Sequence, residues 1–252
     1  MLHIYYVLCE DNICGRIIKN NSLTTRNNMK RGKKYQASAE KIDKNKVYSV
    51  SEAVKLVKEN KVAKFDESVE VHVRMEIDPK KGDQQVRGAT VLPNGTGKSK
   101  KIAVATLTKA DEAKKSGADI VGGEDLIEKI KSGKIEFDIL VATPEMMPKL
   151  AVIAKILGPK GLMPSPKTET VTEKIKEAVE MLKKGKVSFK NDNTGNLHQV
   201  IGKVSFDEKK LEENFVSFMD ALRKSKPTGV KGKFITGITI CSTMGPGVKV
   251  NL

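Results

Sequence analysis

The sequence predicts a discontinuous α+β domain with a small parallel α/β domain inserted into it. Near both ends of the chain, strand-like segments alternate apolar and polar residues, which is typical of antiparallel sheets with one wet face. Between them lie short apolar runs separated by helical patterns, which is typical of parallel strands buried on both faces. We therefore expect a first domain from residues 29–95 plus 186–252 and a second from residues 96–185, with crossings near Gly95 and Gly185.

The first domain is expected to begin with a helix and an alternating strand. In YSVSEAVKLVKEN, Ser49 and Glu52 have the spacing of a capping box ahead of a helical apolar face. The segment SVEVHVRMEID predicts a strand that buries Val69, Val71, Val73 and Met75. Further strands are expected in VRGATVLP, KVSFK, NLHQVIGKVSF and KFITGITICST, and an amphipathic helix in DEKKLEENFVSFMDALRKSKP with the stripe Leu211, Phe215, Phe218 and Leu222.

The inserted domain is expected to alternate strands and helices. Its buried strands are predicted in KKIAVAT, ADIVG and FDILVAT. Its helices are predicted in TKADEAKKSG, capped by Thr108 and stopped by Gly117, in GEDLIEKIKSG, in PEMMPKLAVIAKIL, and in VTEKIKEAVEMLKKGK with the stripe Val171, Ile175, Val179 and Leu182.

Residues 1–28 differ in composition from the rest and fit neither a secretory signal nor a mitochondrial transit peptide. The basic stretch that opens at Met29 is a plausible start of the mature protein. We expect residues 1–28 to be an extension that is disordered, processed or not translated.

The charge of the chain predicts a polyanionic partner. The formal net charge is +15, with 46 basic residues of which only six are arginine. Lysine suits phosphate better than base edges, and an aromatic content of 4% without tryptophan argues against a stacking platform for single strands. The three cysteines and three histidines form no disulfide or zinc pattern, so we expect no metal and a reducing, cytosol-like compartment. No apolar run approaches the ~18 residues of a membrane helix.

Two loops are candidates for chemistry. NGTGKS, residues 94–99, looks like the end of a phosphate-binding P-loop, but Leu92 stands where that motif needs glycine, and a strand follows instead of a helix. A basic hinge loop is the better interpretation. LGPKGLMPSPK, residues 157–167, is either a stiff connection between domains or a basic loop that faces phosphate. No catalytic residues, and no cofactor, are indicated; the alternative function is a small-molecule enzyme that uses the α/β domain.

Several strings resemble the ribosomal protein L1 family, of bacterial or organellar type. They are KLAVIAKILGPKGLMPSPKTETV, AKFDESVEVHVRMEIDPKKGDQQVRGATVLPNGTGK, GADIVGGEDLIEKI, FDILVATPEMM, FKNDNTGNLHQVIGK and STMGP. The resemblance runs from Met29 to Leu252, and Met1 to Asn28 has no counterpart. It implies that the first domain is of the split β-α-β type and that the inserted domain is Rossmann-like.

The resemblance also implies a function. The family binds large-subunit (23S-type) ribosomal RNA at the mobile stalk, helps deacylated tRNA leave the exit site, and represses translation by binding its own mRNA leader. It implies a protein that is monomeric off the ribosome, has no membrane partner, and sits on a cytoplasmic or organellar ribosome.

The residues expected to contact ribosomal RNA are carried over by the same matching. They are Lys64, Phe65, Ser68, Glu70 and His72 at the first strand, Phe189, Lys190, Asp192, Thr194, Gly195 and His198 around the second turn, and Ser242, Thr243, Met244 and Gly245 near the C-terminus. The family usually has threonine where Ser68 stands, so the hydroxyl is kept and the methyl group is lost. For the last turn we expect hydroxyl contacts to 2′-OH and phosphate groups, an apolar contact from Met244, and close backbone approach at Gly245.

Overall fold

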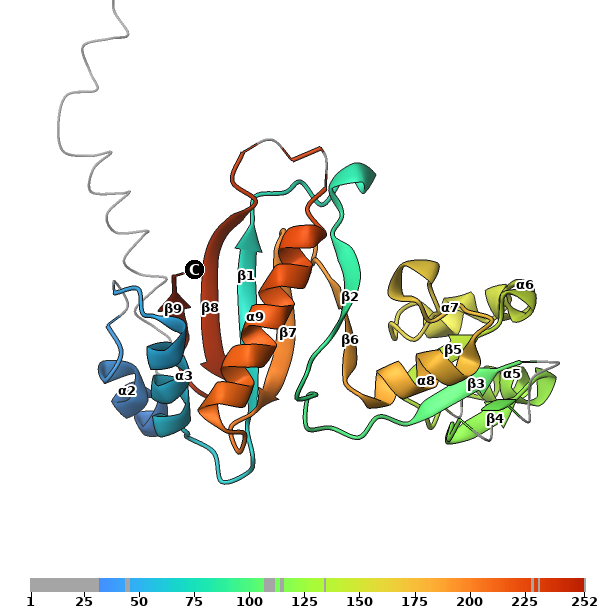
Figure 1. Cartoon of the computed structure of the whole chain (residues 1–252), viewed down its shortest axis with the longest axis horizontal. Helices are drawn as coiled ribbons and strands as arrows, with labels where there is room; N and C mark the ends of the chain where they lie inside the picture. The colour runs from blue at the N-terminus through green and yellow to red at the C-terminus, as the bar shows by residue number, and fades with distance from the viewer. Residues whose placement is uncertain are drawn as a thin grey trace, which may run out of the picture.

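The computed structural model describes residues 32–43, 46–106, 112–113, 116–133, 135–227, 229–230 and 232–251. The expectations for residues 1–28, and most of the expected helix in TKADEAKKSG, therefore fall outside the described residues. The described chain is a mixed α/β protein, as the sequence predicts, with helices and three separate sheets. Figure 1 shows two sheets around α9 and the third sheet to one side, beyond β2 and β6.

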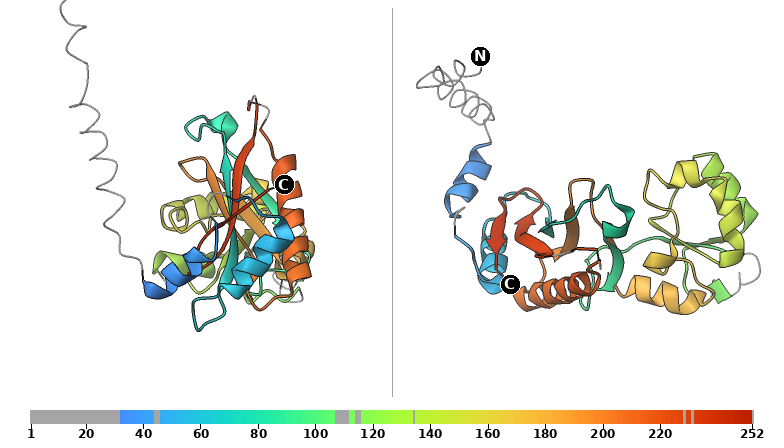
Figure 2. Two further views of the ribbon diagram at one scale, coloured as in Figure 1. Left: turned by 90° about the vertical axis from the view of Figure 1, so that its left-hand side faces the viewer. Right: turned by 90° about the horizontal axis from the view of Figure 1, so that it is seen from above.

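The largest sheet is antiparallel and has the strand order β7-β1-β8-β9. Its strands are β1 (Ser68–Met75), β7 (Asn196–Lys203), β8 (Ile235–Ser242) and β9 (Val248–Val250). Helix α9 (Glu208–Lys224) connects β7 to β8, which lie on either side of β1. Both α9 and α3 (Val50–Glu59) lie on one face of this sheet, as the two views of Figure 2 show. We call the opposite face the outer face.

The alternation of β1 decides what the sheet buries. Val69, Val71, Val73 and Met75 are all buried, and they share one core with the predicted stripe of α9. The capping box of α3 is present, because the Ser49 hydroxyl accepts from the Glu52 backbone and the Glu52 carboxylate accepts from the Ser49 backbone. This core draws residues from both ends of the sequence and none from residues 93–186.

A two-stranded antiparallel ribbon leads out of this core. It pairs β2 (Arg87–Val91) with β6 (Lys186–Lys190), and β2 packs against α9. Two short helical segments come before the β2–β6 ribbon in the sequence, helix α2 (Lys33–Glu40) and the 3-10 turn η1 (Gly82–Gln84).

The middle of the chain forms a parallel sheet with the strand order β4-β3-β5, as predicted. Its strands are β3 (Ile102–Ala105), β4 (Ile120–Gly122) and β5 (Ile139–Ala142). One apolar cluster packs α5 (Glu124–Lys131) against the sheet, and a second packs α8 (Ile175–Lys183) against it. Alternate residues of β3 enter different clusters, which is why its whole sequence is apolar.

Two helix predictions in this region need correction. PEMMPKLAVIAKIL is not one helix but three short pieces, η2 (Pro144–Met146), α6 (Met147–Ala151) and α7 (Ala154–Leu157), partly because Pro148 has no N–H to continue a helix from η2. Helix α8 begins at Ile175, so Val171 is not on its stripe. Val171 instead bridges Ala142 of β5 in parallel, after the 3-10 turn η3 (Pro166–Thr168).

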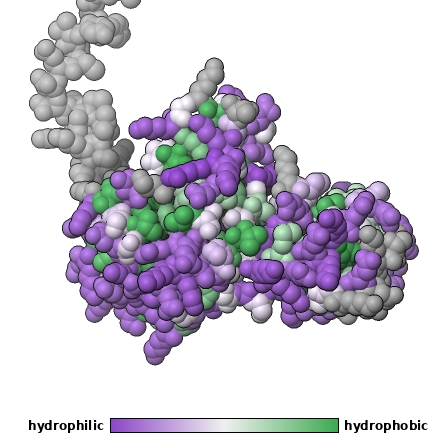
Figure 3. Space-filling model, in the orientation of Figure 1, coloured by the Kyte–Doolittle hydropathy of each residue, from purple (hydrophilic) through white to green (hydrophobic). Residues whose placement is uncertain are grey.

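The face of the molecule that carries α9 is mostly hydrophilic. Figure 3 shows that its hydrophobic residues lie in small separate patches. Among the helices that the structure describes, none is both long and apolar enough to cross a membrane.

Candidate nucleic-acid interface

A buried carboxylate fixes the turn of residues 243–245 that follows β8. Glu67 has 0% of its surface exposed, and its carboxylate accepts from the backbone N–H groups of Val62 at 3.0 Å, of Ala63 at 2.6 Å and of Met244 at 3.3 Å. Burial alone would raise the pKa of Glu67, but hydrogen bonds from the Ser242 hydroxyl and these N–H groups lower it below its ordinary value. The ionised carboxylate therefore holds residues 62–63 and the C-terminal turn together.

Ser68 and Thr243 tie the same turn to the start of β1. The Thr243 N–H donates to the Ser68 carbonyl at 3.1 Å, and the Ser68 N–H donates to the Thr243 hydroxyl at 3.0 Å. The Thr243 hydroxyl lies 3.3 Å from the Ser68 carbonyl and donates to it. These bonds leave Met244 projecting into solvent, with 54% of its surface exposed. Phe65, at 56%, is likewise exposed on the loop before β1.

A second turn, residues 192–196, is closed by Asp192. Its carboxylate accepts from the Thr194 N–H at 2.9 Å, the Asn196 N–H at 2.7 Å and the Thr194 hydroxyl at 2.6 Å. These bonds, the Thr194 hydroxyl first, outweigh burial and lower the pKa of Asp192, so it stays ionised. Gly195 has φ +80° and is buried, and a Cβ at this position would lie 3.2 Å from the Ile77 carbonyl. The turn is therefore pre-formed before any partner binds.

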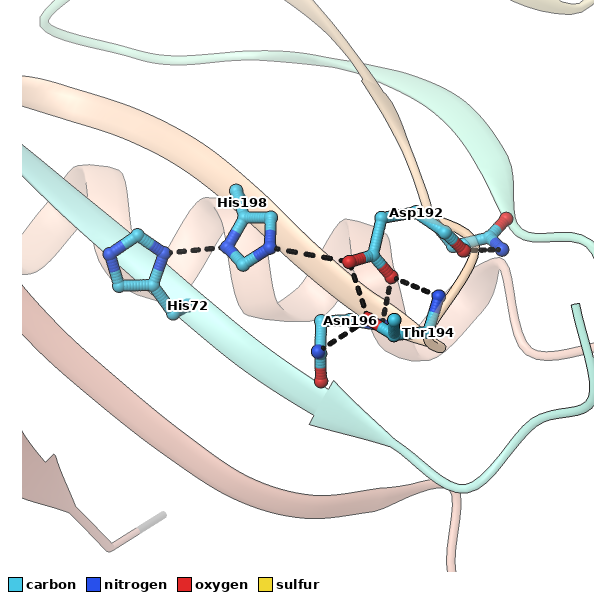
Figure 4. A network of polar contacts seen from close by, with 6 residues as sticks. His72, Asp192, Thr194, Asn196 and His198 are labelled. Carbon is cyan, nitrogen blue, oxygen red and sulfur yellow. Dashed lines mark hydrogen bonds and ion pairs between the residues drawn. The ribbon is translucent and has the colours of Figure 1, made fainter. Parts of the chain in front are cut away.

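Two histidines connect this turn to the middle of the outer face. His198 of β7 and His72 of β1 stand opposite each other, with 2.7 Å between their Nδ1 atoms, and His198 Nε2 lies 3.7 Å from Asp192 Oδ2 (Figure 4). The other ring nitrogen of His72 is 3.0 Å from the Cys241 sulfur. Burial and the neighbouring His198 lower the pKa of His72, although Glu70 acts in the opposite direction. The row Asp192–His198–His72–Cys241 thus runs across three strands.

The outer face is also hollowed beside these histidines. A groove of about 630 Å³ is lined by both histidines, by Arg74 of β1 and by Lys249 of β9, with Asn196 and Asn251 among the remaining polar groups. Val47, Ile238 and Val250 also line it, so the groove offers two permanent cations for phosphate groups beside apolar side chains for ribose or base faces.

The structure leaves most of the expected RNA-contacting residues exposed or half-exposed, but not all of them. Exposed or half-exposed are Lys64, Phe65, Ser68, Glu70, His72, Lys190, Asp192, Thr194, His198, Thr243, Met244 and Gly245. Phe189 and Ser242 are instead 4% and 2% exposed.

These two side chains therefore cannot be surface contacts. Phe189 points into the core, where its ring stacks edge-on against Phe218 with 5.8 Å between centroids. The Ser242 hydroxyl is used on Glu67. Gly195 is also buried, so its place in the site is to shape the turn.

Glu67 is the residue that sequence reasoning missed. A signal was present, because Glu67 stands two residues before Val69 and so shares the inward face of the β1 pattern. A carboxylate on an inward face needs several donors, which predicts a folded loop around it.

Within the described part of the chain, no three His, Cys, Asp or Glu side chains are grouped so as to hold a metal ion. The geometry provides a polar surface with two turns fixed by internal hydrogen bonds, with exposed cations, and with the exposed apolar side chains of Phe65, Met244 and Val47.

Exposed cations beside hydrogen-bonding groups are typical of the class of proteins that bind a polyanion through a folded surface. Comparison with known proteins gives the family. The model of the ribosomal protein L1p/L10e family matches residues 57–246, so the chain belongs to that family. It is a family of structural ribosomal proteins, which confirms the prediction of a non-enzyme and sets the small-molecule enzyme aside.

The curated relatives agree along almost their whole length. The chain is 54% identical to large ribosomal subunit protein uL1 of Mycoplasma capricolum over 219 residues, 86% of this chain and 97% of that protein. It is 54% identical to the uL1 proteins of Mesoplasma florum over 212 residues, 84% and 93% of the two chains, and of Mycoplasma mycoides over 219 residues, 86% and 97%.

Proposed function

We propose that this protein is a structural constituent of the large ribosomal subunit and binds large-subunit ribosomal RNA through the outer face and its two turns. Membership of the ribosomal protein family supports the first statement. The observation that carries the second statement, RNA binding, is the set of hydrogen bonds to the buried Glu67 carboxylate. These bonds hold residues 243–245 beside the loop that carries Lys64 and Phe65. A scaffold of this kind is expected where a turn must meet a partner in one fixed conformation.

The chemistry of the exposed groups suits folded RNA. Lys64, Lys190 and the cations of the groove are placed to neutralise phosphates. Met244 and Phe65 offer apolar contact to ribose or base faces, and the hydroxyls of Thr243 and Thr194 have acceptor capacity left for 2′-OH groups. Glu70 and Asp192 would repel phosphate, so we expect the backbone to pass beside them and their carboxylates to accept from 2′-OH or base donors.

The finer parts of the proposal rest on family resemblance. They are assistance in releasing deacylated tRNA from the exit site, repression of translation through the protein's own mRNA leader, a monomeric state off the ribosome, and a cytoplasmic location on the ribosome. The division into a first domain of the split β-α-β type and an inserted domain belongs here too. It is supported by β7 and β8 flanking β1 with α9 between them in sequence, and by apolar clusters that do not mix the two parts.

A gradient profile and filter binding test the function. The protein should comigrate with large subunits, and it should bind a large-subunit RNA stem-loop with a slope of log K against log salt of roughly −3.5 to −4.5, if ~5 phosphates are contacted. Met244→Ala should weaken binding by about fivefold, as loss of ~1 kcal/mol of apolar contact. Lys64→Gln should reduce the slope by ~0.8.

Matched controls come from the opposite side of the sheet. Val216→Ala removes an apolar side chain with 53% of its surface exposed on α9, and Lys209→Gln removes an exposed lysine of the same helix. Both should bind like the parent. Equal losses in site and control variants would show that the outer face is not the RNA surface.

A further inference from the structure

The loop of residues 96–100 has unused donors. Gly95 still donates its N–H, to the Leu92 carbonyl at 3.1 Å, and Lys101 donates to Asp138 at 2.9 Å. Between them, the five backbone N–H groups of residues 96–100 donate to no acceptor among the described residues. A run of free N–H groups in a glycine-containing loop is the arrangement by which backbones cradle anions.

The loop is held in place rather than merely left open. Asn214, buried in α9, accepts from the Asn94 N–H at 3.1 Å and donates to the Gly95 carbonyl at 3.0 Å. Thr96 is buried, and a Cβ on Gly97, whose φ is +73°, would lie 3.1 Å from the Phe206 ring. The entrance to the loop is therefore anchored on the terminal core before any ligand arrives.

A pocket lies on the loop and carries net positive charge. Its volume is about 460 Å³, and its ionisable lining is Lys98, Lys100 and Lys183 against the single carboxylate of Asp119. Asp119 is already engaged by the Ile102 N–H at 2.8 Å, and the Lys183 ammonium is held over the pocket by the Gly117 carbonyl. That ammonium also offsets the carbonyl groups at the carboxyl end of α8.

A bound anion would stabilise the charged form of the lysines that line this pocket. Burial has the largest effect and lowers the pKa of Lys100, the nearby Asp138 carboxylate raises it, and the smaller repulsion from Lys98 lowers it again. A bound anion would relieve this repulsion and stabilise the charged ammonium.

We propose that the loop of residues 96–100, together with Lys183, is a binding site for a phosphate group. The ligand chemistry is a phosphate oxygen anion, supplied either by an RNA backbone or by a free phosphate or nucleotide. The missing glycine at position 92 excludes the P-loop geometry for hydrolysis, but it does not affect this cradle. The site lies apart from the outer face, and the proposal does not rest on the function proposed above.

Amide shifts of the isotope-labelled full chain test the site directly. Inorganic pyrophosphate in the millimolar range should shift the amide signals of residues 96–100 saturably if the site accepts free phosphate. The ribosomal RNA stem-loop should shift them instead if the source is an RNA backbone. If neither ligand shifts these five amides saturably, the proposal is overturned, whether or not the RNA binds elsewhere.

Two double variants with the same change of charge distinguish an RNA backbone from free phosphate as the ligand. If the ligand is RNA, Lys98→Gln/Lys100→Gln should reduce the slope of log K against log salt by about 1 to 2, at ~0.7–0.9 per phosphate. Lys129→Gln/Lys131→Gln on α5 is the control and should leave this slope unchanged. With free phosphate, the first variant should lose the pyrophosphate shifts and keep the parental slope. An RNA-bound amide shift without a slope difference between the two variants would contradict an RNA source. Because the titration of the parent chain needs no variant, a variant that fails to fold leaves the test intact.

Discussion

Gly95 and Gly185 pack backbone against backbone where the chain leaves and re-enters the terminal core. A Cβ on Gly185 would lie 2.6 Å from the Gly95 Cα, and the two residues have φ values of +66° and +103°. The Gly185 carbonyl also accepts from the Leu92 N–H at 3.3 Å. The two crossings thus meet at one point, and both positions need glycine for conformation, the second also for space.

Gly185→Ala should therefore be among the more destabilising glycine substitutions in this chain. It combines an unfavourable φ with a backbone clash that no side-chain movement relieves, and we expect a loss of ~1–3 kcal/mol. Gly133→Ala is the matched control, because Gly133 has φ +84° and a Cβ there would meet nothing within 4 Å. Urea unfolding of both variants gives the difference. If the two lose the same stability, the close approach of the crossings contributes nothing.

Removing residues 96–184 should leave a folded, RNA-binding remnant. Because Gly95 and Gly185 touch, a linker of very few residues can close the gap without moving β2 or β6. The terminal apolar core contains no residue of the deleted segment, so its packing is retained. Circular dichroism and filter binding measure the outcome. A remnant without secondary structure would refute the division into two domains.

Gly245→Ala should damage the C-terminal turn through space rather than through backbone conformation. Gly245 has no positive φ, but its Cβ would lie 2.4 Å from the Ser242 hydroxyl oxygen, which is the group bonded to Glu67. We expect about a tenfold loss of RNA affinity, or ~1.4 kcal/mol, as the hydroxyl is displaced. Gly82→Ala in η1, which lies outside the groove, has open space around its Cβ and should bind normally. Equal affinity of the two variants would remove the turn from the site.

The elements with a clear local pattern could be predicted from the sequence. The alternation around Val71 and the stripe around Phe215 report burial directly, since each follows the period of its own element. The helix expected in residues 144–157 was wrong because an apolar run does not show where Pro148 divides it. Only the folded chain shows contacts between distant segments, such as Ser68 with Thr243.

The candidate site shows the same limit. The exposed residues of β1 could be predicted from the alternation of its side chains. Phe189 was nevertheless expected at the surface, although the same alternation in β6 places it on the inward face with Val187, two residues before it. Whether a turn hydroxyl faces a partner or its own backbone depends on the tertiary contact, which is why Ser242 was placed on the surface and is buried.

The histidine pair should make the folded state less stable at mildly acidic pH. The Nδ1–Nδ1 hydrogen bond of His72 and His198 needs one neutral ring, and burial followed by His198 lowers the pKa of His72 below its ordinary value of 6.5. A group whose pKa is depressed on folding binds its proton more readily when unfolded. Stability is therefore full above pH 6.5 and falls as the pH drops below it. Melting temperatures between pH 8 and pH 5.5 should show a decline that His72→Gln reduces. An identical decline in that variant would exclude the pair as the cause.

Glu67→Gln should weaken both stability and RNA binding, and its stability cost should depend on pH. The glutamine amide keeps one acceptor oxygen, but an NH₂ group replaces the other oxygen. This NH₂ group would face the N–H and hydroxyl donors that the carboxylate accepts from, so we expect a loss of ~1–3 kcal/mol of stability at neutral pH. Because the pKa of Glu67 is lowered from 4.5 on folding, the carboxylate stabilises the protein above that pH, and the benefit is lost as the pH falls further through the folded-state pKa. The stability gap between parent and variant should therefore narrow as the pH falls below 4.5. Glu76→Gln, at an exposed position just after β1, is the control and should change neither property.

Urea unfolding at pH 7 and pH 4 and filter binding at pH 7 measure the effects of the Glu67 and Glu76 variants. A Glu67 variant with parental stability and affinity would show that the buried carboxylate does not hold the C-terminal turn in its binding conformation.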